Sequence, residues 1–305
     1  MKDSDSPVVN DEFCLAIDIG GTKFAVAIID RLGNIFGRSQ MDTPKVSDAE
    51  ILLKVLLALV SKVMSDAPGK PIRACGVGCG GPMDSDGDRV SPLNIPGWRQ
   101  FPLRTKLSEF LEVPIFVDND AKALALGEGW IGTAVGISNY MSMVVSTGIG
   151  GGIVIDGSIL HGRLGNAGHI GHVVVDPDGA SCVCGGKGCL EAMASGTAIE
   201  ALTGKSAIGA DPKVIELVGT LVGRAVGSVA NLLDLSLVTV AGSVALGYGL
   251  PFFLAAQREI ERRCHLDFST GTKIVPSILG DKAPLIGAGA LGWQSLDVQE
   301  LNVRI

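Results

Sequence analysis

One short pattern occurs twice in this chain, and the repetition constrains the fold more than any other feature. Residues 14–30 read CLAIDIGGTKFAVAIID, and residues 141–156 read MSMVVSTGIGGGIVID. In each segment an apolar strand enters a turn of small and polar residues, a second apolar strand returns, and an aspartate closes the pattern, Asp30 or Asp156. Such segments predict β-hairpins. We therefore infer an internal duplication of two related domains, with the boundary near residues 120–134.

The rest of the chain alternates between strand and helix patterns, which predicts an α/β architecture. We expect the first domain over residues 1–120, the second over 121–293, and the segment 294–305 packed back on the first. Apolar residues at helical spacing predict a helix over 47–65 with Ser47 as its N-cap. Further helices are predicted over 190–202, 213–232, 251–264 and 283–296, and further strands over 114–120 and 238–244.

Composition narrows the class of partner. The 305 residues carry a net charge of −7, which argues against nucleic acid and against an anionic membrane surface. Although 47% of the residues are hydrophobic, charges and glycines interrupt the apolar runs before the roughly 18–20 residues that a membrane-spanning helix needs. The polar start MKDSDSPVVNDEF lacks the pattern of a signal peptide or of a DNA-binding helix-turn-helix. We therefore expect a cytoplasmic protein that binds small molecules.

Three of the seven cysteines stand close to a histidine in a glycine-rich stretch. His172 precedes Cys182, Cys184 and Cys189, and this spacing fits a structural Zn²⁺ site of the Cys₃His type. Such a shell is closed, so the zinc would have no open position for catalysis. The alternative is a set of buried apolar cysteines in a flexible loop. The other cysteines fit reduced, mostly buried thiols: Cys14, Cys75, Cys79 and Cys264.

The turn of the first hairpin is a candidate phosphate site. Glycine lets the backbone approach a polyanion, and hydroxyl, ammonium and carboxylate groups stand beside it, the last as a possible Mg²⁺ ligand. The residues concerned are Asp18, Gly20, Gly21, Thr22 and Lys23. Taken alone, this pair of glycines could be only a turn. The matching turn at Thr147 and Gly148 favours a nucleotide site, since two such turns facing each other across a cleft can hold a triphosphate from both sides.

Asn119 and Asp120 follow a predicted strand and are the catalytic candidates. A carboxylate there can accept the proton of a substrate hydroxyl that attacks a γ-phosphoryl group. The alternative is that the pair only caps a helix that starts at Ala121. Other positions have the polar or permissive character of a sugar site, namely Gly81, Asn94 and Glu191.

These motifs together resemble the ROK family of sugar kinases and repressors over nearly the whole chain. The matching segments are AIDIGGTK, VDNDA, STGIGGGI, GH…CVCGGKGCLE, VAGSV and LGDKAPLIGAGAL. The resemblance implies two related α/β domains of the actin-like ATPase (ribonuclease H-like) type with a cleft between them, ATP with Mg²⁺ as phosphoryl donor, and a homodimer. It implies Asp120 as the general base. It implies sugar contacts from Asn94, Asn119, His172 and Glu191, and adenosine contacts from Gly242 and Ser243.

One departure from the family pattern bears on the substrate. Glucose kinases of the family have Glu-x-Gly-His where this chain has His169-Ile-Gly-His172. Both this histidine pattern and the segment Ser146-Thr147-Gly148 are similar to the bacterial N-acetylmannosamine kinases of the family. An imidazole can donate to the carbonyl of an acetamido group, whereas a glutamate accepts from hydroxyls. The resemblance thus implies phosphorylation of the 6-hydroxyl of N-acetylmannosamine. One alternative is a glucokinase in which the change to histidine at position 169 does not alter the substrate. The other is a sugar-sensing regulatory protein that binds its ligand without turnover.

Overall fold

The structure, a computed structural model, describes residues 12–303. The chain divides into two compact units: unit 1 is formed by the residues up to Asp118 together with those from Ala288 onward, and unit 2 is Asn119–Gly287. Both boundaries differ from the predicted ones at 120 and 294. The second boundary falls inside a single helix, α9 (Ala283–Val303), because this helix begins in unit 2 and continues into unit 1.

Unit 1 is built on a five-stranded sheet with the order β3-β2-β1-β4-β7. β1 pairs antiparallel with β2 and parallel with β4. The strands are β1 (Phe13–Ile19), β2 (Lys23–Asp30), β3 (Ile35–Asp42), β4 (Ile72–Cys79) and β7 (Ile115–Asn119). Two short strands, β5 (Arg89–Val90) and β6 (Phe101–Pro102), form a separate pair. The hairpin predicted over 14–30 is formed by β1 and β2, and the strand predicted over 114–120 is β7, which is one residue shorter at each end.

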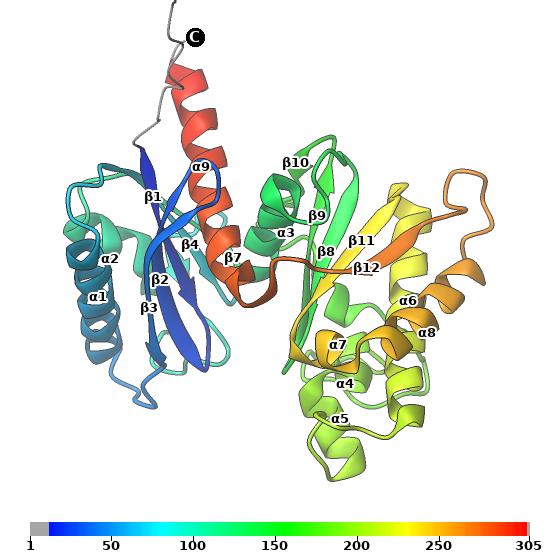
Figure 1. Ribbon diagram of the computed structural model, residues 1–305. Helices are drawn as coiled ribbons and strands as arrows, with labels where there is room; N and C mark the ends of the chain where they lie inside the picture. Colours follow the sequence, from blue (N-terminus) through cyan, green and yellow to red (C-terminus); the bar gives the residue numbers. More distant parts are fainter. Residues whose placement is uncertain (1–11, 304–305) are drawn as a thin grey trace, which may run out of the picture. The chain divides into compact units, whose positions relative to one another are not determined.

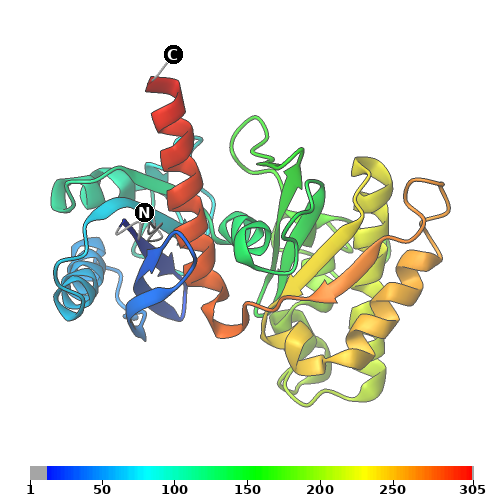
Figure 2. The ribbon, with the colours of Figure 1, turned by 45° about the horizontal axis from the view of Figure 1, so that its top comes forward.

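Helices cover both faces of this sheet, with α1 on one face and α9 on the other (Figures 1 and 2). α1 (Ala49–Asp66) begins after Asp48, whose carboxylate accepts hydrogen bonds from the amides of Glu50 and Ile51 at 2.9 and 3.2 Å. The prediction of Ser47 as the N-cap was wrong, because the carboxylate of Asp48, one position later, accepts from two of the free amides at the helix start. α2 (Leu103–Phe110) buries Leu103 and Leu107 in the same core as α1.

The two faces of β1 differ in side-chain size. Phe13, Leu15, Ile17 and Ile19 belong to the core that α1 covers, and the alternating positions between them carry smaller side chains, beginning with Cys14. Because successive strand residues point to opposite faces, α9 meets the face with little bulk. Large side chains thus fill the α1 side, and close backbone packing characterises the α9 side.

Glycines bring α9 into contact with the sheet backbone. A Cβ atom on Gly76 of β4 would stand 1.9 Å from the carbonyl oxygen of Ala288 and 2.6 Å from the amide nitrogen of Gly292. On the helix side, a Cβ on Gly292 would stand 2.4 Å from Sγ of Cys14. At Gly76 no side chain fits without displacing α9, and at Gly292 a side chain would collide with Cys14.

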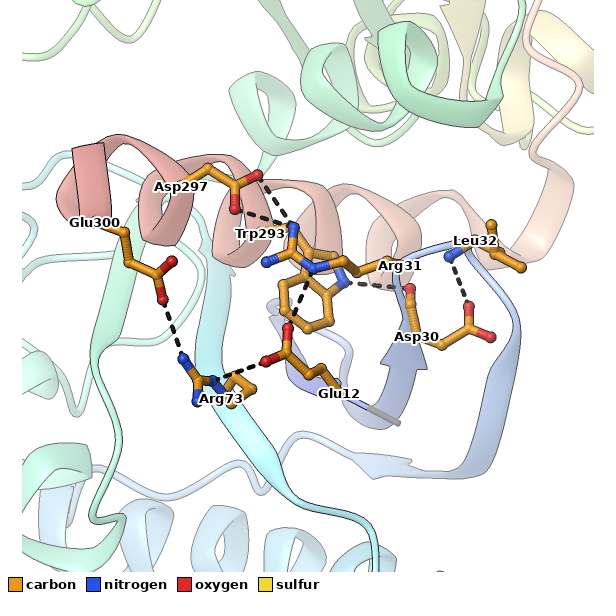
Figure 3. A network of polar contacts seen from close by, with 8 residues as sticks. All are labelled: Glu12, Asp30, Arg31, Leu32, Arg73, Trp293, Asp297 and Glu300. Carbon is orange, nitrogen blue, oxygen red and sulfur yellow. Dashed lines mark hydrogen bonds and ion pairs between the residues drawn. The ribbon is translucent and has the colours of Figure 1, made fainter. Parts of the chain in front are cut away.

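Polar contacts fix the C-terminal half of α9 beside the same sheet (Figure 3). The indole Nε1 of Trp293 donates to the carbonyl of Asp30 at 3.2 Å, and the guanidinium of Arg31 lies 4.2 Å from the centre of that ring. Arg31 also pairs with Asp297 at 3.0 Å. One turn further along, Glu300 pairs with Arg73 at 3.1 Å. Exposed ion pairs contribute little individually, so we ascribe the position of α9 mainly to the glycine contacts.

Unit 2 repeats the architecture of unit 1. Its sheet has the order β10-β9-β8-β11-β12, with β8 antiparallel to β9 and parallel to β11. The strands are β8 (Tyr140–Val145), β9 (Ile149–Ile155), β10 (Ser158–Ile159), β11 (Leu237–Ala241) and β12 (Lys273–Pro276). The prediction of two related α/β domains is therefore confirmed, strand for strand, for the five principal strands of each sheet.

The helices of unit 2 also lie on both faces of its sheet, α3 on one and α6 and α8 on the other (Figures 1 and 2). They are α3 (Asp120–Ile131), α4 (Leu190–Ala194), α5 (Gly196–Thr203), α6 (Pro212–Leu233), α7 (Ser243–Tyr248) and α8 (Leu250–Glu261). The helix predicted over 190–202 is interrupted at Ser195, whose side chain accepts from the amide of Ala198 and starts α5. The strand predicted to reach residue 244 ends at Ala241, because Ser243 already begins α7.

Within residues 12–303, one helix, α6, is long and apolar enough to cross a membrane by length and composition. The sequence analysis expected no such run. Half of the apolar window is buried inside the protein, and α6 packs along α8 in the main core of unit 2. Core helices have the same composition, so this feature is weak evidence for a membrane span.

The contact between α9 and β4 gives a first prediction. Gly76→Ala places a methyl group against the backbone of α9, which cannot rotate out of the way, so the variant should lose about 2–3 kcal/mol of stability. A lower melting temperature in thermal unfolding followed by circular dichroism is the expected result. The control is Gly247→Ala, where a Cβ meets nothing within 4 Å. Equal melting temperatures for both variants would show that α9 does not depend on this contact.

Candidate active site

The predicted site residues fall into two groups, one in each unit. The group of unit 1 is Asp18, Gly20, Gly21, Thr22, Lys23, Gly81 and Asn94. The group of unit 2 is Asn119, Asp120, Thr147, Gly148, His169, His172, Cys182, Cys184, Cys189, Glu191, Gly242 and Ser243.

In unit 1 the turn between β1 and β2 is tight and is held from the side. The amide of Gly20 donates to the carbonyl of Lys23 at 2.9 Å, and the hydroxyl of Thr43 donates to the carbonyl of Gly20 at 2.7 Å. The amide of Thr43 also donates a hydrogen bond to the carbonyl of Thr22 at 3.0 Å. Thr22 itself is exposed, whereas Asp18 is 7% exposed at the end of β1. The turn therefore offers a fixed backbone with accessible polar side chains, as a phosphate site requires.

The predicted sugar residues of unit 1 lie beside this turn. A Cβ atom on Gly21 would stand 2.3 Å from Cβ of Asn94, so the backbone of Gly21 lies directly against Asn94 and only glycine fits there. The carbonyl of Gly81 accepts a hydrogen bond from the amide of Leu93 at 3.3 Å. Gly81 and Asn94 thus belong to one substructure with the phosphate turn, although neither is near it in the sequence.

In unit 2, Asn119 and Asp120 stand where β7 ends and α3 begins. Oδ1 of Asn119 and Oδ1 of Asp120 both accept from the amide of Ala121, at 3.0 and 2.8 Å. Asn119 is thus the N-cap of α3, whereas Asp120 is already the first residue of the helix, one position before the predicted start at Ala121. This position does not exclude chemistry, because the Asp120 side chain remains accessible to solvent. Desolvation by the surrounding protein raises the pKa of Asp120 above its ordinary value, and the bond from Ala121 opposes this rise.

Two histidines follow in one short segment of unit 2. His169 precedes the 3₁₀ turn Ile170–His172, and the rings of His169 and His172 lie nearly parallel with their centres 6.0 Å apart. Desolvation and the neighbouring His172 lower the pKa of His169, while the charges of Glu191 and Asp120 act in the opposite direction. His169 is therefore a neutral imidazole near pH 7, with one nitrogen that donates and one that accepts.

Glu191 links the histidine segment to the second phosphate turn. It lies in the first turn of α4, and its Oε2 accepts from the amide of Ile149 at 2.9 Å. The same oxygen would stand 3.0 Å from a Cβ on Gly148. The sequence analysis placed Glu191 among the sugar contacts but missed this bond, because the two partners are 42 positions apart.

The second phosphate turn is anchored by two helix starts. The carbonyls of Ser146 and Thr147 accept the amides of Gly196 and Thr197 at the start of α5, at 2.7 and 3.2 Å. The hydroxyl of Ser146 lies 3.0 Å from that of Ser243 at the start of α7. Gly242 has φ of 102°, and a Cβ there would meet the carbonyl oxygen of Val145 at 2.3 Å. The structure therefore brings Thr147, Gly148, Gly242 and Ser243 together.

The four predicted metal ligands converge. Their nitrogen and sulfur atoms all lie within 4.8 Å of one another. Nδ1 of His172 is 3.7 Å from Sγ of Cys182, and the Sγ atoms of Cys184 and Cys189 are also 3.7 Å apart. Tetrahedral zinc with Zn–S bonds of about 2.3 Å separates its sulfur ligands by about 3.8 Å. The donor set and these two separations thus fit a structural zinc ion.

Comparison with known proteins places this architecture in a family. The model of the ROK family matches residues 14–295. The chain is 36% identical over 255 residues to an N-acetylmannosamine kinase of Haemophilus influenzae, which covers 77% of this chain and 82% of that protein. It is 31% identical over 327 residues to a glucokinase of Halalkalibacterium halodurans, covering 96% of this chain and 98% of that protein.

The solved structures agree with these relatives. The structure of a ROK family glucokinase from Streptomyces griseus in complex with glucose and AMPPNP superimposes with a TM-score of 0.78 at 28% identity, covering 92% of this chain and 99% of that one. The fold is thus the actin-like ATPase fold of the ROK sugar kinases. The chain belongs to the ROK family.

Proposed function

We propose that this protein is an ATP- and Mg²⁺-dependent kinase that phosphorylates the 6-hydroxyl of N-acetyl-D-mannosamine. The similarity to a curated N-acetylmannosamine kinase supports the reaction and the substrate. Both phosphate turns and an accessible aspartate support phosphoryl transfer as opposed to sugar binding alone. We expect the enzyme to act as a homodimer in the cytoplasm, on small molecules and without nucleic acid or membrane.

The observation that carries the choice of sugar is the paired imidazoles. His169 is accessible, nearly parallel to His172, and neutral near pH 7 because its pKa is lowered. A neutral imidazole can donate one hydrogen bond to the carbonyl oxygen of a 2-acetamido group. A glutamate at this position could only accept, which suits a 2-hydroxyl. The imidazole therefore favours an N-acylated amino sugar.

The proposed chemistry follows from the groups around Asp120. Its carboxylate takes the proton of the 6-hydroxyl while the sugar oxygen forms a bond to the γ-phosphorus and the bond from that phosphorus to ADP breaks. The turns at Gly20–Lys23 and Thr147–Gly148 bind the phosphates, with Gly242 and Ser243 at the adenosine. Asp18 is the residue that would hold Mg²⁺, directly or through water.

A panel of sugars tests the substrate. We expect kcat/KM, measured by coupled ADP release, to be highest for N-acetylmannosamine among that sugar, glucose, mannose and N-acetylglucosamine. His169→Glu should shift the ratio of kcat/KM toward glucose, because a donor is replaced by an acceptor. A wild-type preference for glucose would identify a glucokinase instead, as the relative in Halalkalibacterium suggests. No ADP release with any hexose would identify a sugar-sensing regulator.

Asp120→Asn tests the catalytic role separately from the capping role. Asparagine still accepts from Ala121, so the melting temperature should stay near that of the wild type. It cannot take a proton, so kcat should fall by about 10² or more. The wild-type kcat should also decline as the pH falls through the raised pKa of Asp120, since the base must be deprotonated.

The matched control for this variant is Asp211→Asn. Asp211 caps α6 by accepting from the amide of Lys213 at 2.9 Å, so it is an aspartate whose carboxylate accepts from an amide at a helix start, as that of Asp120 does at α3. Its replacement should leave kcat unchanged. If Asp120→Asn kept wild-type turnover as well, Asp120 would be a helix cap and the general base would have to be another group.

We also propose that His172, Cys182, Cys184 and Cys189 bind one structural Zn²⁺ per chain. With Nδ1 of His172 facing the sulfur atoms, its Nε2 is left to donate to a sugar hydroxyl, and metal binding would fix that orientation. The ion would act on the sugar only through this ring and through the backbone that leads to Glu191.

Elemental analysis should find one zinc per chain. Cys184→Ser should lose the metal, sugar affinity and stability, whereas nucleotide binding should persist in part because the phosphate turns lie on other segments. The control is Val183→Ser in the same loop, where 91% of the side chain is exposed and no donor atom is removed. Fully active protein with zinc far below one equivalent would contradict the proposal.

A further inference from the structure

Lys122 is a buried lysine for which the functions described above have no use. It is the third residue of α3, two positions after Asp120, and only 1% of its surface is exposed. Lysine is almost never buried to this extent unless its ammonium has a partner. Here Nζ donates to the carbonyl oxygen of Gly165 at 2.6 Å. The sequence analysis passed over Lys122, although a charge in the otherwise apolar stretch AKALALG was a signal.

Gly165 belongs to the loop of residues 160–169, which ends at His169. The loop closes on itself, since the amide of Ala167 donates to the carbonyl of His161 at 3.0 Å. The residues from 161 to 164 are exposed. At its end Gly168 lies against β9, where a Cβ would stand 2.3 Å from the carbonyl oxygen of Gly151. The loop is thus held at two points, by this packing and by Lys122.

The other end of the Lys122 side chain is immobile. A Cβ on Gly152 of β9 would stand 2.7 Å from Cα of Lys122, so the backbone of the lysine is pressed against the strand. From this fixed base the buried stem reaches Gly165, four positions before His169. The charge of Lys122 is also felt at His169, where it opposes protonation of the imidazole.

We propose that Lys122 is a positioning residue: by holding the carbonyl of Gly165 it sets where His169 stands relative to Asp120, and so it contributes to the preference for the group at carbon 2 of the sugar. The part that concerns the sugar rests on the proposed function above. The part that concerns the loop does not, since Lys122 holds Gly165 whatever the protein binds.

The loop can be tested without any substrate. Arg163 is an exposed trypsin site inside it. Lys122→Met keeps an unbranched apolar stem but removes the ammonium, so initial cleavage after Arg163, identified by fragment mass, should accelerate about tenfold through local opening. Lys213→Met is the control, because it makes the same change at an exposed position on α6 of the same unit. It should leave the cleavage rate unchanged.

The kinetic test separates positioning from general damage. In Lys122→Met, KM for N-acetylmannosamine should rise about tenfold, the scale of one lost charged hydrogen bond, while KM for ATP and kcat at saturating sugar change little. KM for mannose, which lacks the acetamido group, should rise less. Lys122→Arg keeps a charged donor and should recover part of the loss. If Lys122→Met does not fold, Lys122→Gln, which retains an amide donor, should show the same pattern more weakly.

Each outcome decides a different point. Wild-type cleavage at Arg163 and a wild-type KM in the variants would overturn the proposal and leave Lys122 as a core residue. A parallel fall of kcat and rise of both KM values, without rescue by arginine, would show general destabilisation and would overturn it too. If the wild type phosphorylates no N-acylated sugar, the proposed substrate is wrong, and the cleavage result still reports on the loop.

Discussion

The candidate site of unit 2 depends on three consecutive glycines in β9. Gly150 and Gly152 face α3, where added Cβ atoms would stand 3.2 Å from Cβ of Ala121 and 2.7 Å from Cα of Lys122. Gly151 faces the other way, toward the carbonyl of Gly168 at 3.1 Å. Successive strand residues point to opposite faces, so the three glycines leave both faces of β9 without side chains at this level. The helix that begins with Asp120 can therefore approach the strand backbone from one face, and the segment that contains His169 from the other.

This constraint explains the glycine-rich composition of the second repeated hairpin. Ile149-Gly150-Gly151-Gly152 follows the turn at Ser146–Gly148, and so many glycines are unusual in the interior of a strand. The structure places all four residues inside β9, paired with Val145 through Ser142 of β8. The turn itself is only Ser146–Gly148. The glycines therefore serve packing, and β9 joins the helix of the proposed base Asp120 to the turn proposed to bind phosphate.

Local signals predicted most of the fold, and long-range contacts account for what the sequence missed. The repeated hairpins predicted two related domains, because a hairpin is encoded by residues next to each other. The cap of α1 was misplaced by one residue, since Ser47 and Asp48 are both good caps and only geometry decides between them. The passage of α9 from one unit to the other could not be predicted, because Gly76 and Gly292 meet across more than two hundred positions.

The same distinction explains the site. Spacing alone grouped the four candidate Cys and His ligands, because they lie within one segment of 18 residues. Lys122 escaped notice because its partner Gly165 lies 43 positions away, and Glu191 was expected only to contact sugar. Yet Oε2 of Glu191 already accepts from Ile149, so part of the accepting capacity of this carboxylate is used within the protein. The residue proposed to bind sugar is thus hydrogen-bonded to the first residue of β9, directly after the turn proposed to bind phosphate.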